Sequence, residues 1–376
     1  MHIHLKKGAS QKEISIIEKR LKKYNCQISV QKGKKRKVLA VIGETSGIPD
    51  DAVEGLPGIE RIARVLKTYK PAAQTGPLHD LHETIVKIGK VRVGGNQLVI
   101  MAGPCSVQNE YHIMKSAEIV KEAGCQILRG GVKKWRSVPT AWHGVGYKNL
   151  RKGLNMIVKA GREFDLPVIV EIMCSQDIPI YEDAGVDCLQ VGAINSENQD
   201  LLDALANTKL PVLHKRGKGV EVEQFLNWVS RIMKNGKTNV IPCERGVVSG
   251  VNNTMRNPPD FGFIVAARYG LTHLPIAFDP SHSGGDRKYV IPLAQSAIAA
   301  GAKALIVEMH PNPLVALTDA KQGLFPEQLV DLVKICSAQW NVSQKAYKFA
   351  TKNLEKLEKK YEPKMKKDEK DFAPIE

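Results

Sequence analysis

Polar residues that could do chemistry end seven short apolar runs in this chain of 376 residues. The ends read Gly-Pro-Cys105-Ser106, Arg129-Gly-Gly, Glu171, Lys215-Arg216-Gly, Glu244-Arg245-Gly, Asp279-Pro-Ser-His282 and Glu308-Met-His310. A single charged residue after an apolar run can belong to a structural ion pair. Seven such ends favour one shared site, provided that the fold brings them together.

Four basic residues at or near these ends suit an anionic substrate. They are Arg129, Lys134, Lys215 and Arg245. At a site from which water is largely excluded, the attraction of these cations to phosphate or carboxylate oxygens is stronger than at an exposed surface. The sequence therefore predicts a substrate with more than one anionic group.

Four further residues could bind a metal ion: Cys105, His282, Glu308 and Asp319. One sulfur, one imidazole and two carboxylates are compatible with several divalent transition metals and select none of them. The alternative is a buried cysteine with unrelated polar neighbours. The run Ser281 to Gly285 could also surround a phosphate with N–H groups, although glycine pairs form ordinary turns as well.

The elements that must position these residues alternate between strand and helix length from residue 97 onward, which is the pattern of βα units. Eight strands are expected, over Leu98–Gly103, Cys125–Gly130, Pro167–Met173, Cys188–Gly192, Pro211–Lys215, Val240–Glu244, Leu274–Asp279 and Ala304–His310. Continuous apolar runs are typical of parallel strands buried on both faces. We therefore predict an α/β fold, a (β/α)8 TIM barrel whose chemistry lies at the C-terminal strand ends. A doubly wound sheet is the alternative.

Residues 1–70 have the pattern of a small α+β domain that precedes the barrel. Strands are expected over His2–Leu5, Cys26–Val30, Val38–Ile42 and Ile59–Leu66, a helix over Gln11–Tyr24 and a short helix within 50–55. The order βαββαβ is that of a ferredoxin-like domain. Residues 71–96 would be a linker and lead-in, 97–340 the barrel, and 341–376 a charged tail, expected to be an exposed helix that frays.

Charge and composition narrow the classes of ligand. Lys and Arg outnumber Asp and Glu by 55 to 39, a net charge of +16, which favours nucleic acid, anionic membranes or phosphorylated metabolites. Aromatic residues make up only 6%, so a base-stacking surface and nucleic-acid binding are not expected. No run of ~18–20 apolar residues predicts a membrane helix, and the start lacks a secretory apolar region, so we expect a cytoplasmic protein. The seven cysteines include no CxxC pair, which argues against a disulfide framework.

Taken together, the motifs resemble those of the 3-deoxy-D-arabino-heptulosonate 7-phosphate (DAHP) synthases, in the short form with an N-terminal ferredoxin-like regulatory domain. The motifs are Ala102-Gly-Pro-Cys-Ser106, Leu128-Arg-Gly-Gly131, Lys134-x-Arg136, His214-Lys-Arg-Gly217, Cys243-Glu-Arg-Gly246, Asp279-Pro-Ser-His-Ser-Gly-Gly285, Ile306-Val-Glu-Met-His-Pro311 and Thr318-Asp-Ala-Lys-Gln322. The resemblance implies a metal-dependent, aldol-type condensation of phosphoenolpyruvate with erythrose 4-phosphate. This transferase reaction is the first step of the shikimate pathway to aromatic amino acids.

By motif position, the resemblance implies a role for each residue. One divalent metal ion, such as Mn, Fe, Co or Zn, would be bound by Cys105, His282, Glu308 and Asp319. Phosphoenolpyruvate would be held by Arg129, Lys134, Lys215 and Arg245, and erythrose 4-phosphate contacted by Arg136 and Ser137. Lys134 would join Cys105 and His282 in catalysis as the proton donor, because a lysine among other cations has a reason for a lowered pKa. A homotetramer that binds an aromatic amino acid effector is also implied.

The chain departs from the family pattern at two places. The family run Gly-Ala-Arg-Asn, whose Arg contacts a substrate phosphate, is here Gly192-Ala-Ile194-Asn195, and Trp135 replaces a Pro in the loop after Lys134. Losing one charged hydrogen bond would weaken phosphate binding by roughly ten- to a hundredfold unless another group compensates. Two alternatives follow: a related enzyme that condenses phosphoenolpyruvate with a different phosphosugar or aldehyde, and a catalytically silent paralogue that binds a ligand or partner.

Overall fold

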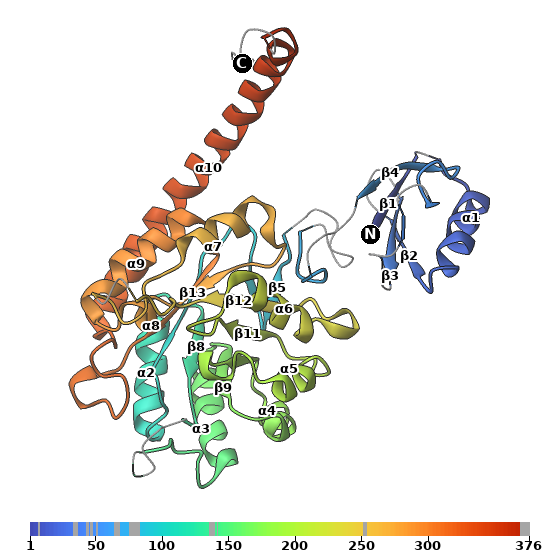
Figure 1. Cartoon of the computed structure of the whole chain (residues 1–376). Coiled ribbons are helices and arrows are strands. Elements are labelled where there is room, and N and C mark those ends of the chain that lie inside the picture. The colour runs from blue at the N-terminus through green and yellow to red at the C-terminus, as the bar shows by residue number, and fades with distance from the viewer. Residues whose placement is uncertain are drawn as a thin grey trace.

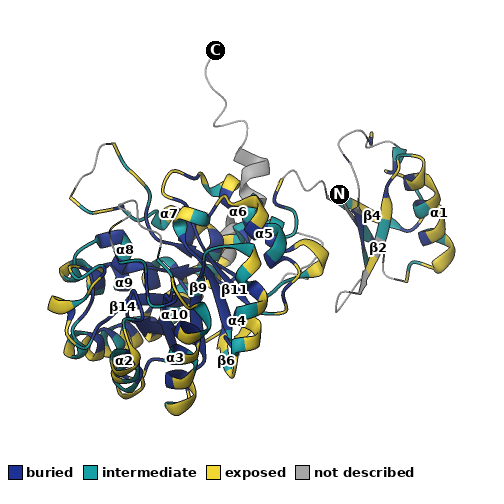
Figure 2. Cartoon of the chain, turned by 90° about the horizontal axis from the view of Figure 1, so that it is seen from below, coloured by how far each residue is buried: buried dark blue, intermediate teal, exposed yellow. Residues whose placement is uncertain are grey.

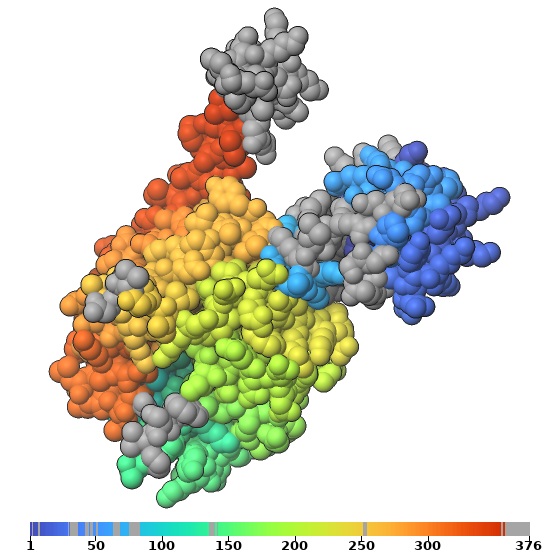
Figure 3. Space-filling model, viewed as in Figure 1, coloured from blue at the N-terminus to red at the C-terminus, as the bar shows by residue number. Residues whose placement is uncertain are grey.

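The computed structural model describes residues 1–6, 8–32, 37–42, 45, 48–49, 52–63, 68–74, 83–134, 140, 142–250 and 254–368. These residues form a small N-terminal domain and a barrel, and a long C-terminal helix stands out from the barrel (Figure 1). Figure 3 shows the same projection of this helix on the molecular surface.

The N-terminal domain has the expected ferredoxin-like topology. Its sheet has the order β2-β3-β1-β4 and all neighbours are antiparallel. The strands are β1 (His2–Leu5), β2 (Gln27–Lys32), β3 (Lys37–Ile42) and β4 (Ile59–Ala63), and the helix is α1 (Gln11–Lys22).

Helix α1 begins at a capping box, in which Ser10 and Glu13 satisfy each other's backbone N–H groups. Its apolar stripe, Ile14, Ile17 and Leu21, is buried in the core of this domain. The short helix expected within 50–55 falls partly outside the described residues, which omit 50 and 51; residue 52 has a 3₁₀-helical conformation and 53–55 form turns. Residues 64–66, the expected end of β4, also lie outside them.

Eight parallel strands close into a barrel in the order β10-β11-β12-β13-β14-β7-β8-β9, which confirms the TIM barrel and excludes an open doubly wound sheet. The strands are β7 (Val99–Gly103), β8 (Ile127–Gly130), β9 (Val168–Ile172), β10 (Cys188–Val191), β11 (Val212–Lys215), β12 (Val240–Glu244), β13 (Ala277–Phe278) and β14 (Ala304–Glu308). All eight expected strands are present, and their side chains are almost entirely buried (Figure 2).

A short hairpin, β5 (Val86–Ile88) and β6 (Val91–Val93), covers the base of the barrel. Its Val86, Ile88 and Val93 pack against barrel side chains near the N-terminal strand ends, among them Val99 and Ile127. The polar residues described below lie at the opposite end of the barrel, where the strands finish.

Helices surround the barrel. They are α2 (Glu110–Glu122), α3 (Leu150–Glu163), α4 (Ile178–Ala184), α5 (Gln199–Leu205), α6 (Val222–Ile232), α7 (Phe261–Ala266), α8 (Pro280–Gly284), α9 (Arg287–Ala300) and α10 (Pro326–Asp368). Asn side chains cap α2, α3 and α5 at their N-termini. Helix α10 packs against α9 and continues without interruption past residue 340, where we expected a separate tail to begin. In the described part of the chain, no helix combines the length and the apolar character that a membrane span requires.

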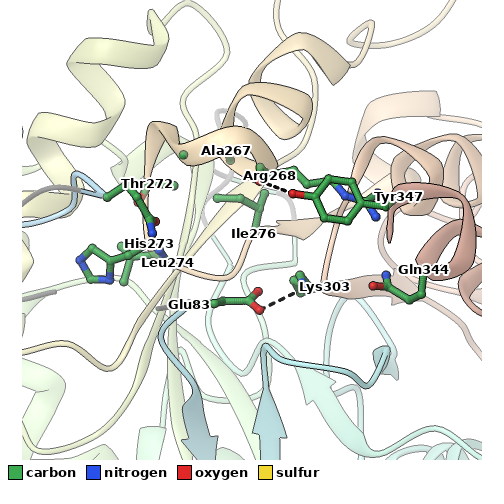
Figure 4. Close-up of a pocket in the computed structure, with 13 residues that line it drawn as sticks. Glu83, Ala267, Arg268, Thr272, His273, Leu274, Ile276, Lys303, Gln344 and Tyr347 are labelled. Atoms are coloured by element: carbon green, nitrogen blue, oxygen red, sulfur yellow. Dashed lines mark hydrogen bonds and ion pairs between the residues drawn. The ribbon is translucent and has the colours of Figure 1, made fainter. Parts of the chain in front are cut away.

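The segment that enters the barrel is held at its base beside a cavity of about 260 Å³ (Figure 4). His273 donates from Nε2 to the Pro71 carbonyl at 2.8 Å and accepts at Nδ1 from the Thr84 hydroxyl at 2.7 Å. Lys303 donates to Glu83 at 3.0 Å, and both residues line the cavity. These contacts tie the lead-in segment to the barrel far from the C-terminal strand ends.

Candidate functional site

The ends of β7 and β14 bring together side chains of the kinds that bind metals. The Cys105 Sγ and carboxylate oxygens of Glu308 and Asp319 lie within 4.8 Å of one another. The Cys105 thiol donates to Asp319 Oδ2 at 3.0 Å. His282 Nε2 lies 3.6 Å from Glu308 Oε1 and 3.9 Å from Asp319 Oδ2. All four residues predicted as metal ligands therefore meet at one place.

Neighbouring polar groups fix the direction of these side chains. His282 Nδ1 lies 2.8 Å from Asp279 Oδ2, so the carboxylate holds a proton on Nδ1 and leaves Nε2 facing the cluster. Gln322 donates to Glu308 Oε2 at 2.6 Å. Asp319 has a φ of 51°, a left-handed conformation that Asp tolerates better than most residues.

The donor set fits a divalent metal ion. Burial, followed by the charge of Glu308, raises the pKa of the Cys105 thiol to about 12. Two carboxylates and a thiol held this close repel one another when ionised, and a divalent cation would offset that repulsion. One sulfur, one nitrogen and carboxylate oxygens suit a transition metal better than an all-oxygen site for Mg²⁺ or Ca²⁺.

Three of the predicted substrate-binding cations lie buried beside this cluster. Arg129 is 2% exposed and donates to Glu308 at 3.1 Å and to the Pro104 carbonyl at 3.0 Å. Lys215 pairs with Asp279 at 2.5 Å. Arg245, also 2% exposed, donates only to backbone carbonyls within the described residues.

The Nε atoms of Arg129 and Arg245 have no hydrogen-bond partner in the described part of the chain. A buried guanidinium with an unsatisfied N–H is costly unless a ligand satisfies it. Both residues are therefore ready to bind an anion.

Lys134 lies at the same mouth, but its environment differs from the one expected. Its Nζ donates to Glu171 Oε2 at 2.9 Å. Burial lowers the pKa of Lys134, but the acidic groups beside it, Cys105 and Glu171, outweigh burial and raise it above its ordinary value. The expected lowered pKa was wrong, because that expectation counted the surrounding cations and omitted Glu171.

Gly192, the residue after β10, leaves room for the ion pair of Lys134 and Glu171. A Cβ at Gly192 would lie 2.2 Å from Glu171 Oε1. Ile194, two residues on, is 55% exposed in a 3₁₀ turn (Ala193–Asn195). The two residues predicted to contact erythrose 4-phosphate, Arg136 and Ser137, lie outside the described residues, as does Trp135.

A second buried network of hydrogen bonds holds the backbone of the loop that carries Arg245 in place. The Glu244 carboxylate accepts from the backbone N–H of Arg245 at 3.0 Å and of Gly246 at 2.6 Å. Arg216 donates to Glu244 at 3.0 Å and to Asp260 at 2.7 Å. Gly246 has a φ of 89°, and a Cβ there would lie 1.9 Å from the Asn257 carbonyl oxygen, so the turn requires glycine.

Three residues in this arrangement had no role assigned from the sequence. Glu171 and Asp279 were recognised only as polar strand ends, and pairing them with Lys134 and Lys215 needed the fold. Gln322 lies three residues after Asp319 and ends the motif Thr318-Asp-Ala-Lys-Gln322. For Asp279 and Gln322 the available signal was their place in motifs that contain predicted site residues, whereas Glu171 lies in none of these motifs.

The fold and the site together define a (β/α)8 enzyme with an N-terminal ferredoxin-like domain. The model of the DAHP synthetase I family matches residues 78–345, and that of the DAHP synthase ferredoxin-like domain matches residues 1–67. The chain therefore belongs to the DAHP synthase family, as its motifs had indicated.

Curated relatives and solved structures agree with this membership. The chain is 37% identical to a phospho-2-dehydro-3-deoxyheptonate aldolase of Thermotoga maritima, over 89% of this chain and 96% of that protein. The crystal structure of a T. maritima protein of that name matches with a TM-score of 0.69 at 36% identity, over 91% of this chain and 97% of the other. A 2-dehydro-3-deoxyphosphooctonate aldolase of Geobacter sp. is 30% identical over 66% of this chain and 94% of its own.

Proposed function

We propose that this chain condenses phosphoenolpyruvate with erythrose 4-phosphate to give DAHP and phosphate. The observation that carries the proposal is that four residues able to bind a metal ion lie together with four cations at the C-terminal end of one barrel. Family membership supports the choice of substrates, and the relative with the higher identity bears the matching name.

Phosphoenolpyruvate carries a phosphate and a carboxylate, and the four cations Arg129, Lys134, Lys215 and Arg245 suit two such groups. The free Nε atoms of the two arginines supply hydrogen bonds that no protein group satisfies within the described residues. Bidentate contacts from guanidinium groups would orient the substrate as well as bind it.

The residues Cys105, His282, Glu308 and Asp319 would hold a divalent metal ion, which when bound supplies Lewis acidity toward the aldehyde carbonyl. The new carbon–carbon bond joins C3 of phosphoenolpyruvate to the aldehyde carbon. Lys134 is protonated at neutral pH and lies at the mouth, so it can donate a proton to the new hydroxyl group, and Glu171 holds its ammonium in place. Water adds at C2, and phosphate leaves.

Other expectations from the family resemblance complete the proposal. We place the reaction at the start of the shikimate pathway, in the cytoplasm. The N-terminal domain would act as a regulatory domain that binds an aromatic amino acid, in a homotetramer. Arg136 and Ser137 would contact erythrose 4-phosphate.

A panel of aldehydes tests the proposal. Purified protein with an added divalent metal should consume phosphoenolpyruvate when erythrose 4-phosphate is supplied, and a chelator should stop the reaction. Consumption with only another phosphosugar would replace this function by that of a related condensing enzyme. No consumption with any aldehyde would indicate a silent paralogue.

A further inference from the structure

At one rim of the barrel mouth, Arg245 forms no salt bridge with a carboxylate of the described residues. Arg245 is buried, its Nε is free within the described residues, and it donates only to backbone carbonyls there. The Asn257 side chain and the Arg245 guanidinium both donate to the His282 carbonyl oxygen, at 2.9 and 3.4 Å. Burial, and then the charge of Arg256, lower the pKa of Arg245, so Arg256 lies close to Arg245.

A further cation, Lys218, stands at the same rim. It follows β11, and its backbone carbonyl accepts from Val248 N at 2.7 Å, which ties its loop to the loop that carries Arg245. Burial, and then the charges of Arg245 and Arg256, lower the pKa of Lys218. Arg256 is partly neutralised by Asp319, 3.5 Å away, whereas the Lys218 ammonium has no partner in the described residues.

The loop of Lys218 also lies against the loop of Ile194. Gly217 N donates to Ser196 Oγ at 3.0 Å. Ile194 therefore exposes an alkyl group at this rim, and the adjacent loop carries the ammonium group of Lys218.

We propose that Lys218 binds a substrate phosphate together with Arg245 and supplies the positive charge that position 194 lacks. This inference rests on the proposed function, in which both substrates carry a phosphate monoester. Lys218, Arg245 and Arg256 repel one another, because nearby carboxylates neutralise them only in part. A bound dianion would offset this repulsion and would therefore be held tightly.

The variant Lys218→Met tests the proposal, because it removes the charge and keeps the length of the side chain. We expect the KM for one substrate to rise by about ten- to a hundredfold while kcat changes little. A rise for phosphoenolpyruvate alone assigns Lys218 to that phosphate, and a rise for erythrose 4-phosphate alone assigns it to the other. Lys209→Met is the matched control, since Lys209 is an exposed lysine at the opposite end of β11.

Two further variants separate binding from a structural effect. Lys218→Arg should keep the KM near that of the wild type. Ile194→Arg in the Lys218→Met background should restore much of the lost affinity, because it returns a cation to the same rim. Unchanged KM values for both substrates in Lys218→Met would overturn the proposal while the proposed function stood.

If the wild-type protein condenses no aldehyde, the proposed function fails, and the phosphate site can still be tested. Calorimetry with inorganic phosphate should then show weaker binding to Lys218→Met than to the wild type. Equal binding to both proteins, or binding to neither, would contradict the proposal.

Discussion

At the scale of single residues, the site is built from ion pairs that connect its two halves. Glu308 accepts from Arg129 on one side and faces Asp319 and Cys105 on the other. Asp279 likewise contacts both Lys215 and His282. The predicted substrate-binding cations and the predicted metal ligands therefore position one another. We expect a substitution in one group to alter the geometry of the other.

The first residue-scale prediction concerns Cys105. Cys105→Ser keeps the size of the side chain but replaces the soft sulfur by a hard hydroxyl that ionises far less readily. We expect at least a tenfold loss of affinity for a transition metal, measured by titration of metal-free protein, and loss of phosphoenolpyruvate consumption. Cys174→Ser is the control, because Cys174 contacts Asp177 and is not part of the cluster. Full metal affinity in Cys105→Ser would refute the ligand assignment.

The second residue-scale prediction concerns Lys134. Lys134→Met should lower kcat by about a hundredfold or more, because the proton donor is lost and Glu171 keeps an unpaired negative charge. Lys133→Met is a matched control, since the adjacent Lys133 pairs with Asp177 instead. Steady-state kinetics give the kcat of both variants. Equal kcat values would argue against a role for Lys134 in proton transfer.

At the scale of elements, the strands could be predicted because each is a continuous apolar run buried on both faces. The hairpin β5–β6 was not predicted, since three-residue strands such as Val86–Ile88 carry too short a pattern and gain their burial from the barrel base. The pairing of Lys134 with Glu171 also needed the fold, because it joins the end of β9 to the loop after β8. Motif order indicated the site, and only the closed barrel placed its side chains against one another.

Strand β11 gives the element-scale prediction. Burial lowers the pKa of His214 to about 4 from its ordinary 6.5. Between pH 6.5 and about pH 4, His214 is protonated in the unfolded chain but neutral in the folded chain. The free energy of unfolding should therefore fall by up to ~3 kcal/mol as the pH is lowered across this range.

Urea unfolding at pH 7 and pH 4 measures this effect. His214→Gln, which can still donate to the Ser196 carbonyl, should lose part of the pH dependence. His143→Gln is the control at a less buried position. An unchanged pH dependence in His214→Gln would show that other groups govern the acid sensitivity.

At the scale of the whole molecule, the N-terminal domain and the barrel have separate hydrophobic cores. A truncated DAHP synthase from T. maritima has a solved structure that matches 73% of this chain with a TM-score of 0.65. The net charge of +16, which alone could suggest nucleic acid, includes the cations collected at the barrel mouth.

Deletion of residues 1–67 should therefore leave a folded barrel that still condenses its substrates. Thermal unfolding followed by circular dichroism should remain cooperative, and kcat should stay within about threefold, because no described residue of 1–63 contributes to the site. If the N-terminal domain is the regulatory domain that we propose, the deletion should also abolish inhibition by an aromatic amino acid. An unfolded or inactive barrel would contradict the independence of the two cores.

The most direct test of the central claim is a competition between two aldehydes in one reaction. Phosphoenolpyruvate is supplied with equal amounts of erythrose 4-phosphate and a five-carbon phosphosugar, arabinose 5-phosphate, and the products are separated by mass. The account predicts that the seven-carbon product dominates from the first turnovers. A predominance of the eight-carbon product would contradict it.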